Sequence, residues 1–330
     1  MRICIYGAGA IGGHLAAKLA AAGHAVSAVA RGANLEAVKK NGFKLLHGDA
    51  VIAGRVRAAE HAAQLGAQEA VIVTLKANAL SAFARDCAPL LQSETAVVFA
   101  QNGVPWWYAS GLSAARPRPP DLSRLDPGGL LAAAIPRQNI LGAIVYSAND
   151  LIEPGVVRNY TPGNNMLVVG ESDDRASARI VELRKILEES GVSSPATSDI
   201  REVVWNKLHL SLGTGTVCLL AGCTVGEMRT DARLSEIVRG VAAEGRAIAA
   251  AHGVDVDKAP PRPAGGHASG AIGHKPSILQ DYEAGRPMEI DAQLAAPLAF
   301  ARAMRVATPA LDMLVPLAVH KAASRGLYTT

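Results

Sequence analysis

The chain has 330 residues, of which 49% are hydrophobic and 19% are charged. This composition supports a sizeable core in about two domains, because a domain commonly contains roughly 150 residues. It excludes a disordered chain, a collagen and a coiled coil. The formal net charge is +4, but the basic residues are scattered and no basic run contains interleaved aromatics. The charge pattern therefore argues against a nucleic-acid partner.

The N-terminal segment combines a predicted strand, a glycine-rich turn and a helix. A β-rich run covers residues 2–6, and an Ala/Leu-rich helix is predicted over 14–22. Between them lies the motif G-x-G-x-x-G, formed by Gly7, Ala8, Gly9, Ala10, Ile11 and Gly12. Its glycines permit a tight turn, close approach of a pyrophosphate and close packing of helix on strand. A second strand at 25–30 completes the context of a dinucleotide-binding unit and disfavours a glycine-rich turn without a ligand.

The end of this second strand distinguishes the two nicotinamide cofactors. An acidic residue there binds the ribose 2′-hydroxyl of NAD, whereas an arginine accommodates the 2′-phosphate of NADP. The residues at 28–32 are A-V-A-R-G, so no carboxylate occupies the position and Arg31 follows the strand. Arg31 could also be an ordinary surface arginine, but the absence of a carboxylate at this position is an independent argument for NADP over NAD. We therefore predict NADP(H) as the cofactor.

Two later apolar runs, residues 70–75 and 96–100, are typical of parallel strands covered on both faces. Lys76 follows the first run, and Gln-Asn-Gly at 101–103 follows the second. Ligands bind outside the carboxyl ends of such strands. A solvated lysine and a turn asparagine are the alternatives for Lys76 and Asn102, but their positions favour ligand binding.

The longest stretch without formal charge, residues 208–226, approaches membrane-span length but contains four glycines. We interpret it as a buried core helix and expect no membrane association. Glycines also interrupt the N-terminus, which therefore does not have the pattern of a signal peptide. The cysteines Cys4, Cys87, Cys218 and Cys223 have no Cys-x-x-Cys spacing. This predicts reduced thiols in a cytoplasmic protein rather than disulfides or zinc ligands.

Two segments rich in proline and glycine, residues 109–137 and 258–273, interrupt the regular pattern. Each is either a functional loop, such as a flap over the substrate, or a loose connection. The tryptophans at 106–107 either anchor the first segment to the fold or wall the cleft. His267 and His274 have no carboxylate that completes a ligand set, so we predict no metal site.

The second half of the chain adds further motifs. Trp-Asn-Lys-Leu at 205–208 opens a long helix, and Ser-Ile-Leu-Gln-Asp at 277–281 precedes Ala-Gly-Arg at 284–286 and Glu-Ile-Asp at 289–291. Together with the glycine turn and the strand ending in Gln-Asn-Gly, these segments resemble the ketopantoate reductase (2-dehydropantoate 2-reductase) family over essentially the whole chain. The resemblance implies NADPH-dependent reduction of a 2-oxo acid to a 2-hydroxy acid.

The same resemblance implies roles for individual residues. Lys207 would be the general acid, Ser277 would contact the substrate, and Glu289 would lie near the reacting groups and the cofactor. The nicotinamide half of the cofactor would be bordered by Lys76, Asn102 and Ala148.

The chemistry of the predicted reaction agrees with the role of Lys207. Hydride addition to a carbonyl leaves an alkoxide that must be protonated, and partial desolvation lowers a lysine pKa toward the range of a general acid. A lysine snorkelling from the first turn is the alternative. Glu289 and Asp291 could both be helix-start acids. We favour Glu289 as the residue beside Lys207, because Asp291 would point off that face.

The chain departs from the family at the substrate positions. The family places asparagines four and eight residues after the catalytic lysine and a third in the next loop, where this chain has Ser211, Gly215 and Val225. Unmade hydrogen bonds to buried polar groups cost about 1–3 kcal/mol each. We therefore expect a substrate bulkier or more apolar than ketopantoate, with Ser211 as the remaining polar contact.

We predict an α/β fold with an N-terminal Rossmann-type doubly wound parallel sheet over 1–197 and an all-helical domain over 198–330, with the active site in the cleft between them. One alternative is an NADP-dependent dehydrogenase of a bulkier secondary alcohol, or an imine reductase, on the same scaffold. Another is a non-catalytic NADP-binding sensor, against which the retained Lys207, Ser277 and Glu289 argue. The apolar helical domain is compatible with a homodimer.

Overall fold

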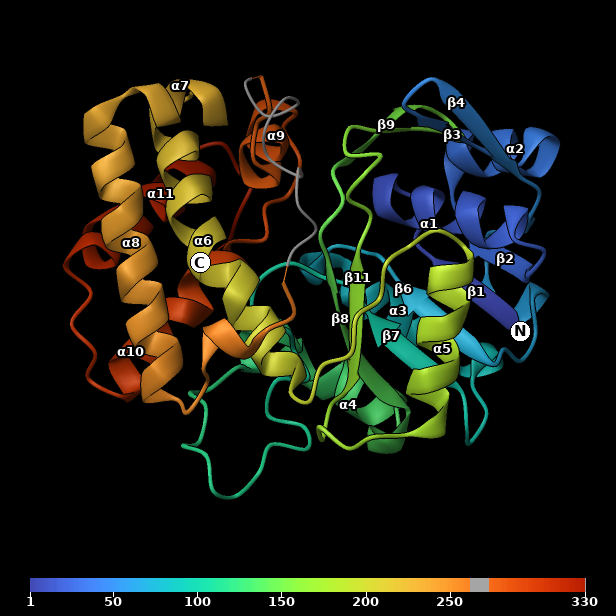
Figure 1. The fold of residues 1–330 in the computed structure, drawn as a ribbon, viewed down its shortest axis with the longest axis horizontal. Coiled ribbons are helices and arrows are strands. Elements are labelled where there is room, and N and C mark those ends of the chain that lie inside the picture. Colours follow the sequence, from blue (N-terminus) through green and yellow to red (C-terminus); the bar gives the residue numbers. More distant parts are fainter. Residues whose placement is uncertain (262–272, 330) are drawn as a thin grey trace. The chain divides into compact units, whose positions relative to one another are not determined.

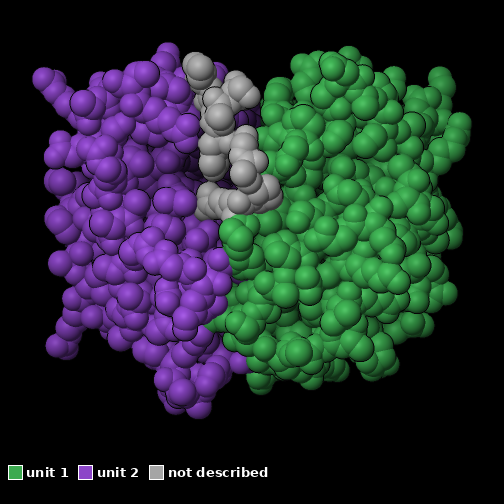
Figure 2. All heavy atoms as spheres, viewed as in Figure 1, with its two compact units in different colours: residues 1–101, 126–200, 260–266 green, residues 102–125, 201–259, 267–330 purple. Residues whose placement is uncertain are grey.

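The computed structural model describes residues 1–261 and 273–329, and the chain divides into two compact units (Figures 1 and 2). Unit 1 consists mainly of residues 1–101 and 126–200. Unit 2 contains residues 102–125, 201–259 and the described residues from 273 onward. The segment 102–125, which begins within the Gln-Asn-Gly motif, thus groups by its contacts with the helical part of the chain.

Unit 1 contains a seven-stranded sheet in the order β11-β8-β7-β6-β1-β2-β5. Neighbouring strands are parallel except for the antiparallel pair of β8 and β11. The strands are β1 (Arg2–Tyr6), β2 (Ala25–Val29), β5 (Arg57–Ala59), β6 (Ala70–Val73), β7 (Ala96–Phe99), β8 (Ile140–Val145) and β11 (Leu167–Glu171). From β1 the chain first extends the sheet toward β2 and later returns to β6 on the other side. This confirms the predicted doubly wound sheet, with its switch point between β1 and β6.

The helices of unit 1 accompany these strands along the chain (Figure 1). They are α1 (Ala10–Ala21), α2 (Gly32–Asn41), α3 (Leu80–Asp86), α4 (Leu130–Ala134) and α5 (Ala178–Glu189). The short helix α4 falls within residues 109–137, where the sequence predicts only a loop.

Unit 1 also contains a second sheet, of order β4-β3-β10-β9, that the sequence did not predict. Its strands are β3 (Phe43–His47), β4 (Ala50–Gly54), β9 (Asn149–Glu153) and β10 (Val156–Asn159). Helix α1 packs on all four strands. The contact is close because a Cβ at Gly13 would lie 2.7 Å from Val157 Cγ2, and one at Gly54 would lie 2.8 Å from the Ala17 Cα.

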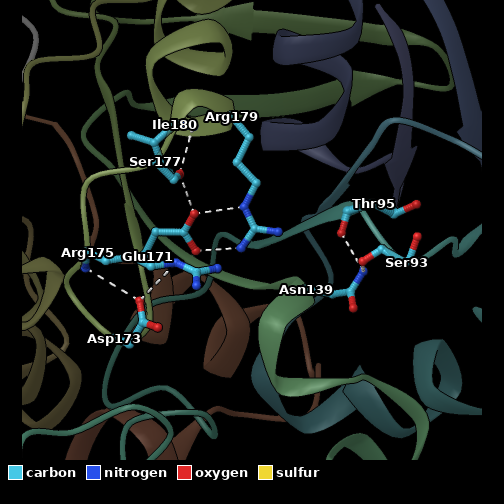
Figure 3. A network of polar contacts seen from close by, with 9 residues as sticks. All are labelled: Ser93, Thr95, Asn139, Glu171, Asp173, Arg175, Ser177, Arg179 and Ile180. Atoms are coloured by element: carbon cyan, nitrogen blue, oxygen red, sulfur yellow. Dashed lines mark hydrogen bonds and ion pairs between the residues drawn. The ribbon is translucent and has the colours of Figure 1, made fainter.

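A buried carboxylate at the end of β11 secures helix α5 (Figure 3). Glu171 is 3% exposed and accepts hydrogen bonds from Arg179 Nε (2.7 Å), Arg179 Nη2 (2.5 Å) and Ser177 Oγ (2.5 Å). The Ser177 hydroxyl in turn accepts the Ile180 N–H and caps the helix. A buried charge is costly unless it is paired, and the two-pronged guanidinium pair compensates it here.

Unit 2 is helical in its described residues. It contains most of α6 (Ile200–Ala221), followed by α7 (Val225–Thr230), α8 (Ala232–Ala251), α9 (Ser277–Glu283), a π-helical turn at Asp291–Ala295, α10 (Ala296–Ala303) and α11 (Pro309–Ala323). The expected buried core helix over 208–226 is present for most of its length but differs in two respects. It ends at Ala221, because Gly222 adopts a left-handed φ of +68°, and Leu210 on its outer face is 41% exposed.

No helix among the described residues combines the length and the apolar character needed to span a bilayer.

The segment after Asn102 is anchored in the core of unit 2. Trp107 and Tyr108 are 1% and 2% exposed, and the Tyr108 hydroxyl accepts the Trp205 Nε1–H at 2.8 Å. The fully buried Arg201 guanidinium donates to the carbonyl oxygens of Tyr108 and Ser110 at 2.8 Å each. The sequence left open whether the tryptophans anchor the following segment to the fold or line the cleft, and the buried Trp107 anchors it.

Helix α1 carries a buried titratable group that links stability to pH. His14 is 1% exposed; burial, with a smaller contribution from the charge of Lys18, lowers its pKa to about 3. In the unfolded chain a histidine has a pKa of about 6.5. Between these values the unfolded state binds the additional proton, so the free energy of unfolding falls as the pH decreases from about 6.5 toward 3.

We expect His14→Leu to flatten this decline by up to about 1.4 kcal/mol per pH unit. The measurement is urea denaturation of both proteins at several pH values between about 5 and 7. His320→Gln, at an exposed histidine, is the control and should keep the wild-type slope. An unchanged slope in His14→Leu would show that His14 does not carry the effect.

Candidate active site

The three glycines of the turn after β1 have different surroundings: two are packed closely and one faces open space. Gly7 has a φ of +110°, and a Cβ there would lie 3.0 Å from the Leu75 N. A Cβ at Gly12 would overlap the Gly7 carbonyl oxygen. At the exposed Gly9, in contrast, a Cβ would meet nothing within 4 Å. Packing explains the first and third glycines but not the second, which leaves open space where a phosphate group would approach the backbone.

The start of α1 is suited to an anion. Gly9 is its N-cap and supplies no side-chain hydrogen bond, so the first N–H groups of this 12-residue helix are not capped by it. Two residues that the sequence analysis missed hold the turn. Thr74 Oγ1 donates to the Gly7 carbonyl oxygen at 2.6 Å, and the Asn34 amide donates to the Ala8 carbonyl oxygen. These residues fit the pyrophosphate of a dinucleotide.

Three further predicted cofactor residues follow parallel strands of the same sheet. Arg31 is exposed and lies between β2 and α2, Lys76 is partly buried after β6, and Ala148 follows β8. The parallel order of β8, β7, β6, β1 and β2 brings these strand ends and the glycine turn to one edge of the sheet. This is the edge at which open α/β sheets bind ligands.

The catalytic candidates lie in unit 2. Lys207 is partly buried on α6, and its Nζ donates a hydrogen bond of 2.7 Å to Asn102 Oδ1. Two residues that the sequence analysis selected separately, 105 positions apart, are thus direct partners. The preceding Gln101, whose role was not predicted, is buried and donates to the carbonyl oxygens of Val73 (2.8 Å) and Leu75 (3.1 Å). It fixes the end of β7 to the end of β6.

A backbone contact places Asn102 and Glu289 on adjoining segments. Gly103 has a φ of +83°, and a Cβ there would overlap the Ala292 carbonyl oxygen. The same oxygen accepts the Val104 N–H at 2.8 Å. Glu289, three residues before Ala292, is 5% exposed, and its carboxylate accepts Gln293 Nε2 at 3.1 Å. The glycine of Gln-Asn-Gly is therefore the residue that allows this approach.

The three positions at which the sequence departs from the family's asparagines differ in their surroundings. Ser211 is exposed, and its hydroxyl donates to the Leu208 carbonyl oxygen at 3.1 Å. A Cβ at Gly215 would make an ordinary contact of 3.5 Å with Ile278 Cγ2, next to Ser277 at the start of α9. Val225 is 6% exposed, and its N–H donates to the His274 carbonyl oxygen at 2.9 Å.

Other residues of the recognised motifs serve the fold. Asp281 is 2% exposed and accepts Arg286 Nε at 2.9 Å across the turn that contains Ala-Gly-Arg. Asp291 accepts Arg124 Nε at 2.8 Å and the Tyr328 hydroxyl at 2.7 Å. Burial, the hydrogen bond to Asp291 and its charge raise the pKa of Tyr328 to about 12. Asp291 thus pairs with a cation and a phenol.

Within the described residues, no group of three or more His, Cys, Asp or Glu side chains is arranged to hold a metal ion. His267 and most of the predicted flap at 258–273 lie outside the described residues.

Comparisons with known proteins cover both units. Residues 3–113 match the family model described as ketopantoate reductase PanE/ApbA, and residues 199–322 match the model of its C-terminal region. A 2-dehydropantoate 2-reductase of Mesorhizobium japonicum is 38% identical over 331 residues, which covers 100% of each chain.

Solved structures agree with this match. A crystal structure from Ralstonia solanacearum MolK2, whose description proposes a ketopantoate reductase, is 37% identical, covers 99% of each chain and has a TM-score of 0.84. A D-mandelate dehydrogenase solved with NADH and anilino(oxo)acetate is 20% identical, covers 99% of this chain and 100% of that chain, and shares the fold with a TM-score of 0.81. The family models and the full-length relative together confirm the resemblance: the chain belongs to the ketopantoate reductase PanE/ApbA family of oxidoreductases.

Proposed function

We propose that this protein is an NADPH-dependent reductase of 2-oxo acids whose side chains are bulkier or more apolar than that of ketopantoate. The hydrogen bond from Lys207 Nζ to Asn102 Oδ1, at 2.7 Å, carries the proposal. It holds a partly buried ammonium group as a hydrogen-bond donor toward a carbonyl-type oxygen. A substrate carbonyl oxygen is the same kind of acceptor and can take the proton from this position.

Four residues of unit 2 have a defined task in the proposed reaction. When bound, the nicotinamide supplies a hydride to the substrate carbonyl carbon. Lys207 donates a proton to the carbonyl oxygen as negative charge develops there. Asn102 holds the lysine side chain in place, and the buried carboxylate of Glu289 offsets the positive charge of the site. Ser277, which is exposed at the start of α9, would contact the substrate.

The residues of unit 1 fit NADPH. The open space at Gly9 and the N–H groups at the start of α1 would receive the pyrophosphate. The exposed Arg31 would hold the 2′-phosphate, since a guanidinium presents a planar fork to phosphate oxygens. Lys76 and Ala148 would border the nicotinamide.

The substrate preference follows from the side chains at the family's asparagine positions. Gly215 and Val225 offer no side-chain hydrogen bond. Val225 is itself buried, and the buried Ile278 lies next to Gly215. Hydroxyl groups of a substrate would lose partners here, whereas an apolar side chain would not.

The alternative of a non-catalytic sensor does not explain why a lysine is held by Asn102.

We expect Lys207→Ala to lower kcat for 2-oxo acid reduction by about 10²–10⁴-fold, the usual contribution of a general acid. NADPH affinity, measured by fluorescence titration, should stay within about twofold. Lys185→Ala, at a lysine whose side chain is 73% exposed, is the control. Turnover by Lys207→Ala at the wild-type rate would remove this residue from the mechanism.

We expect Arg31→Ala to raise the Kd for NADPH by roughly tenfold or more, because a charge-assisted hydrogen bond contributes about 1.5–3 kcal/mol. The Kd for NADH, which has no 2′-phosphate, should change little. Arg55→Ala, at another exposed arginine of unit 1, should leave both values unchanged. An equal loss for both cofactors would contradict the assignment of Arg31.

We expect Gly215→Asn to raise kcat/KM for ketopantoate by about 2–10-fold, because one restored hydrogen bond contributes about 0.5–1.5 kcal/mol. The same change should lower kcat/KM for a phenyl-substituted or branched 2-oxo acid. Gly240→Asn, at an exposed glycine with open space around it, is the matched control. The proposed preference fails if the wild-type protein reduces ketopantoate as efficiently as the apolar substrates.

A further inference from the structure

Helix α6 ends in a turn that joins two cysteines. Gly222 has a φ of +68°, and the carbonyl oxygen of Cys218 accepts the N–H of Gly222 at 2.9 Å and the N–H of Cys223 at 3.3 Å. The second of these bonds spans the six residues of a Schellman-type helix end. In such an end the first and last residues commonly bring their side chains into contact. Here both of these residues are cysteines.

The geometry of the turn is compatible with a disulfide. A disulfide needs α-carbons within about 4.4–6.8 Å of each other, and the backbones of Cys218 and Cys223 are already joined directly by an N–H···O bond. Burial, and then the neighbouring Cys223 side chain, raise the pKa of Cys218 to about 12. The two cysteines occupy the first and last positions of this helix end, whose side chains commonly meet.

The two thiols differ in their access to solvent. Cys218 is buried and Cys223 is partly exposed. A soluble oxidant therefore meets Cys223 first, and Cys218 is placed to react with the product. Cys4 and Cys87 are both buried in unit 1, where burial is the main cause that raises their thiol pKa values. They are natural internal controls.

We propose that Cys218 and Cys223 form a reversible intrachain disulfide when the protein meets a peroxide. Hydrogen peroxide transfers one oxygen atom to the Cys223 sulfur, which gives a sulfenic acid and one water. The Cys218 sulfur then attacks the Cys223 sulfur, the S–O bond breaks and a second water leaves with the thiol proton. In total, two thiols and one peroxide become one disulfide and two waters.

The disulfide would act on the substrate positions of unit 2, a part of the inference that rests on the proposed function. Gly215 lies three residues before Cys218 on α6, and Val225 lies two residues after Cys223. The Val225 N–H is bonded to the His274 carbonyl oxygen in the segment that leads to Ser277. A covalent link across the turn restricts this region, while Lys207 lies on an earlier part of α6. We therefore expect oxidation to change KM more than kcat.

The chemical part is tested by peptide mass spectrometry on the full-length protein. The protein is treated with hydrogen peroxide, quenched with catalase, alkylated with iodoacetamide in urea and cleaved with trypsin. Both cysteines fall in one tryptic peptide, residues 208–229. We expect this peptide to lose two hydrogens and to escape alkylation, and to become doubly alkylated when dithiothreitol precedes the iodoacetamide. The peptides with Cys4 and Cys87 should be alkylated throughout.

Variants and kinetics complete the test. In Cys218→Ser the sulfenic acid should persist at Cys223 and react with dimedone, while Cys223→Ser should form no disulfide. A doubly alkylated peptide after peroxide, or sulfinic acid at Cys223 without the disulfide, would overturn the proposal.

For the kinetic part, peroxide should shift KM several-fold and reversibly in wild type but not in Cys223→Ser. Disulfide formation with unchanged KM would overturn the link to the substrate site. The mass measurement needs no turnover, so a protein that forms the disulfide but reduces no 2-oxo acid would refute only the proposed function.

Discussion

The candidate active site depends on a close approach of two backbone segments at Gly103. The left-handed φ of this residue and its missing side chain let residues 103–104 lie against the Ala292 carbonyl oxygen. A side chain would separate the segments and move Asn102, since the two residues are adjacent in the chain. Asn102 could then neither meet Lys207 nor lie on a segment adjoining that of Glu289. A residue without a side chain thus allows the approach on which the position of Asn102 depends.

Much of unit 1 was predictable because the sequence signals there are local. Strands β1, β2, β6 and β7 are short apolar runs, and their observed ends differ from the predicted ones by at most two residues. The second sheet was missed because β4 and β9 are mostly exposed and show no regular alternation of apolar and polar residues, although β4 is a short apolar run. The end of α6 was placed too late, since the absence of charge in residues 208–226 outweighed the glycine that stops the helix.

The residues with chemical roles in the candidate site were predictable, but the residues that hold them in position were not. Lys207, Asn102 and Glu289 could be selected because a lysine, an amide and a carboxylate in the recognised motifs have chemical roles. Gln101, Gly103, Asn34 and the pair of Arg124 with Asp291 could not be assigned, because each acts through a partner far away in the chain. Such partners have no local signature. Gly7, Gly9 and Gly12 are an exception, because the motif itself assigns them a tight turn, the approach of a pyrophosphate and helix packing, in that order.

The buried Arg201 has a consequence for the surface of unit 2. Its guanidinium fixes the backbone at Tyr108 and Ser110, and farther along the chain Arg124 fixes the same segment to Asp291. Both ends of the segment between these two contacts are therefore held in place, whatever the sequence between them. This stretch can therefore gain or lose residues at little entropic cost, because the penalty for closing a loop grows only slowly with its length. It is a place where the protein can accept a new peptide, such as a tag or a recognition sequence, without a change in the parts that hold Lys207 and Glu289.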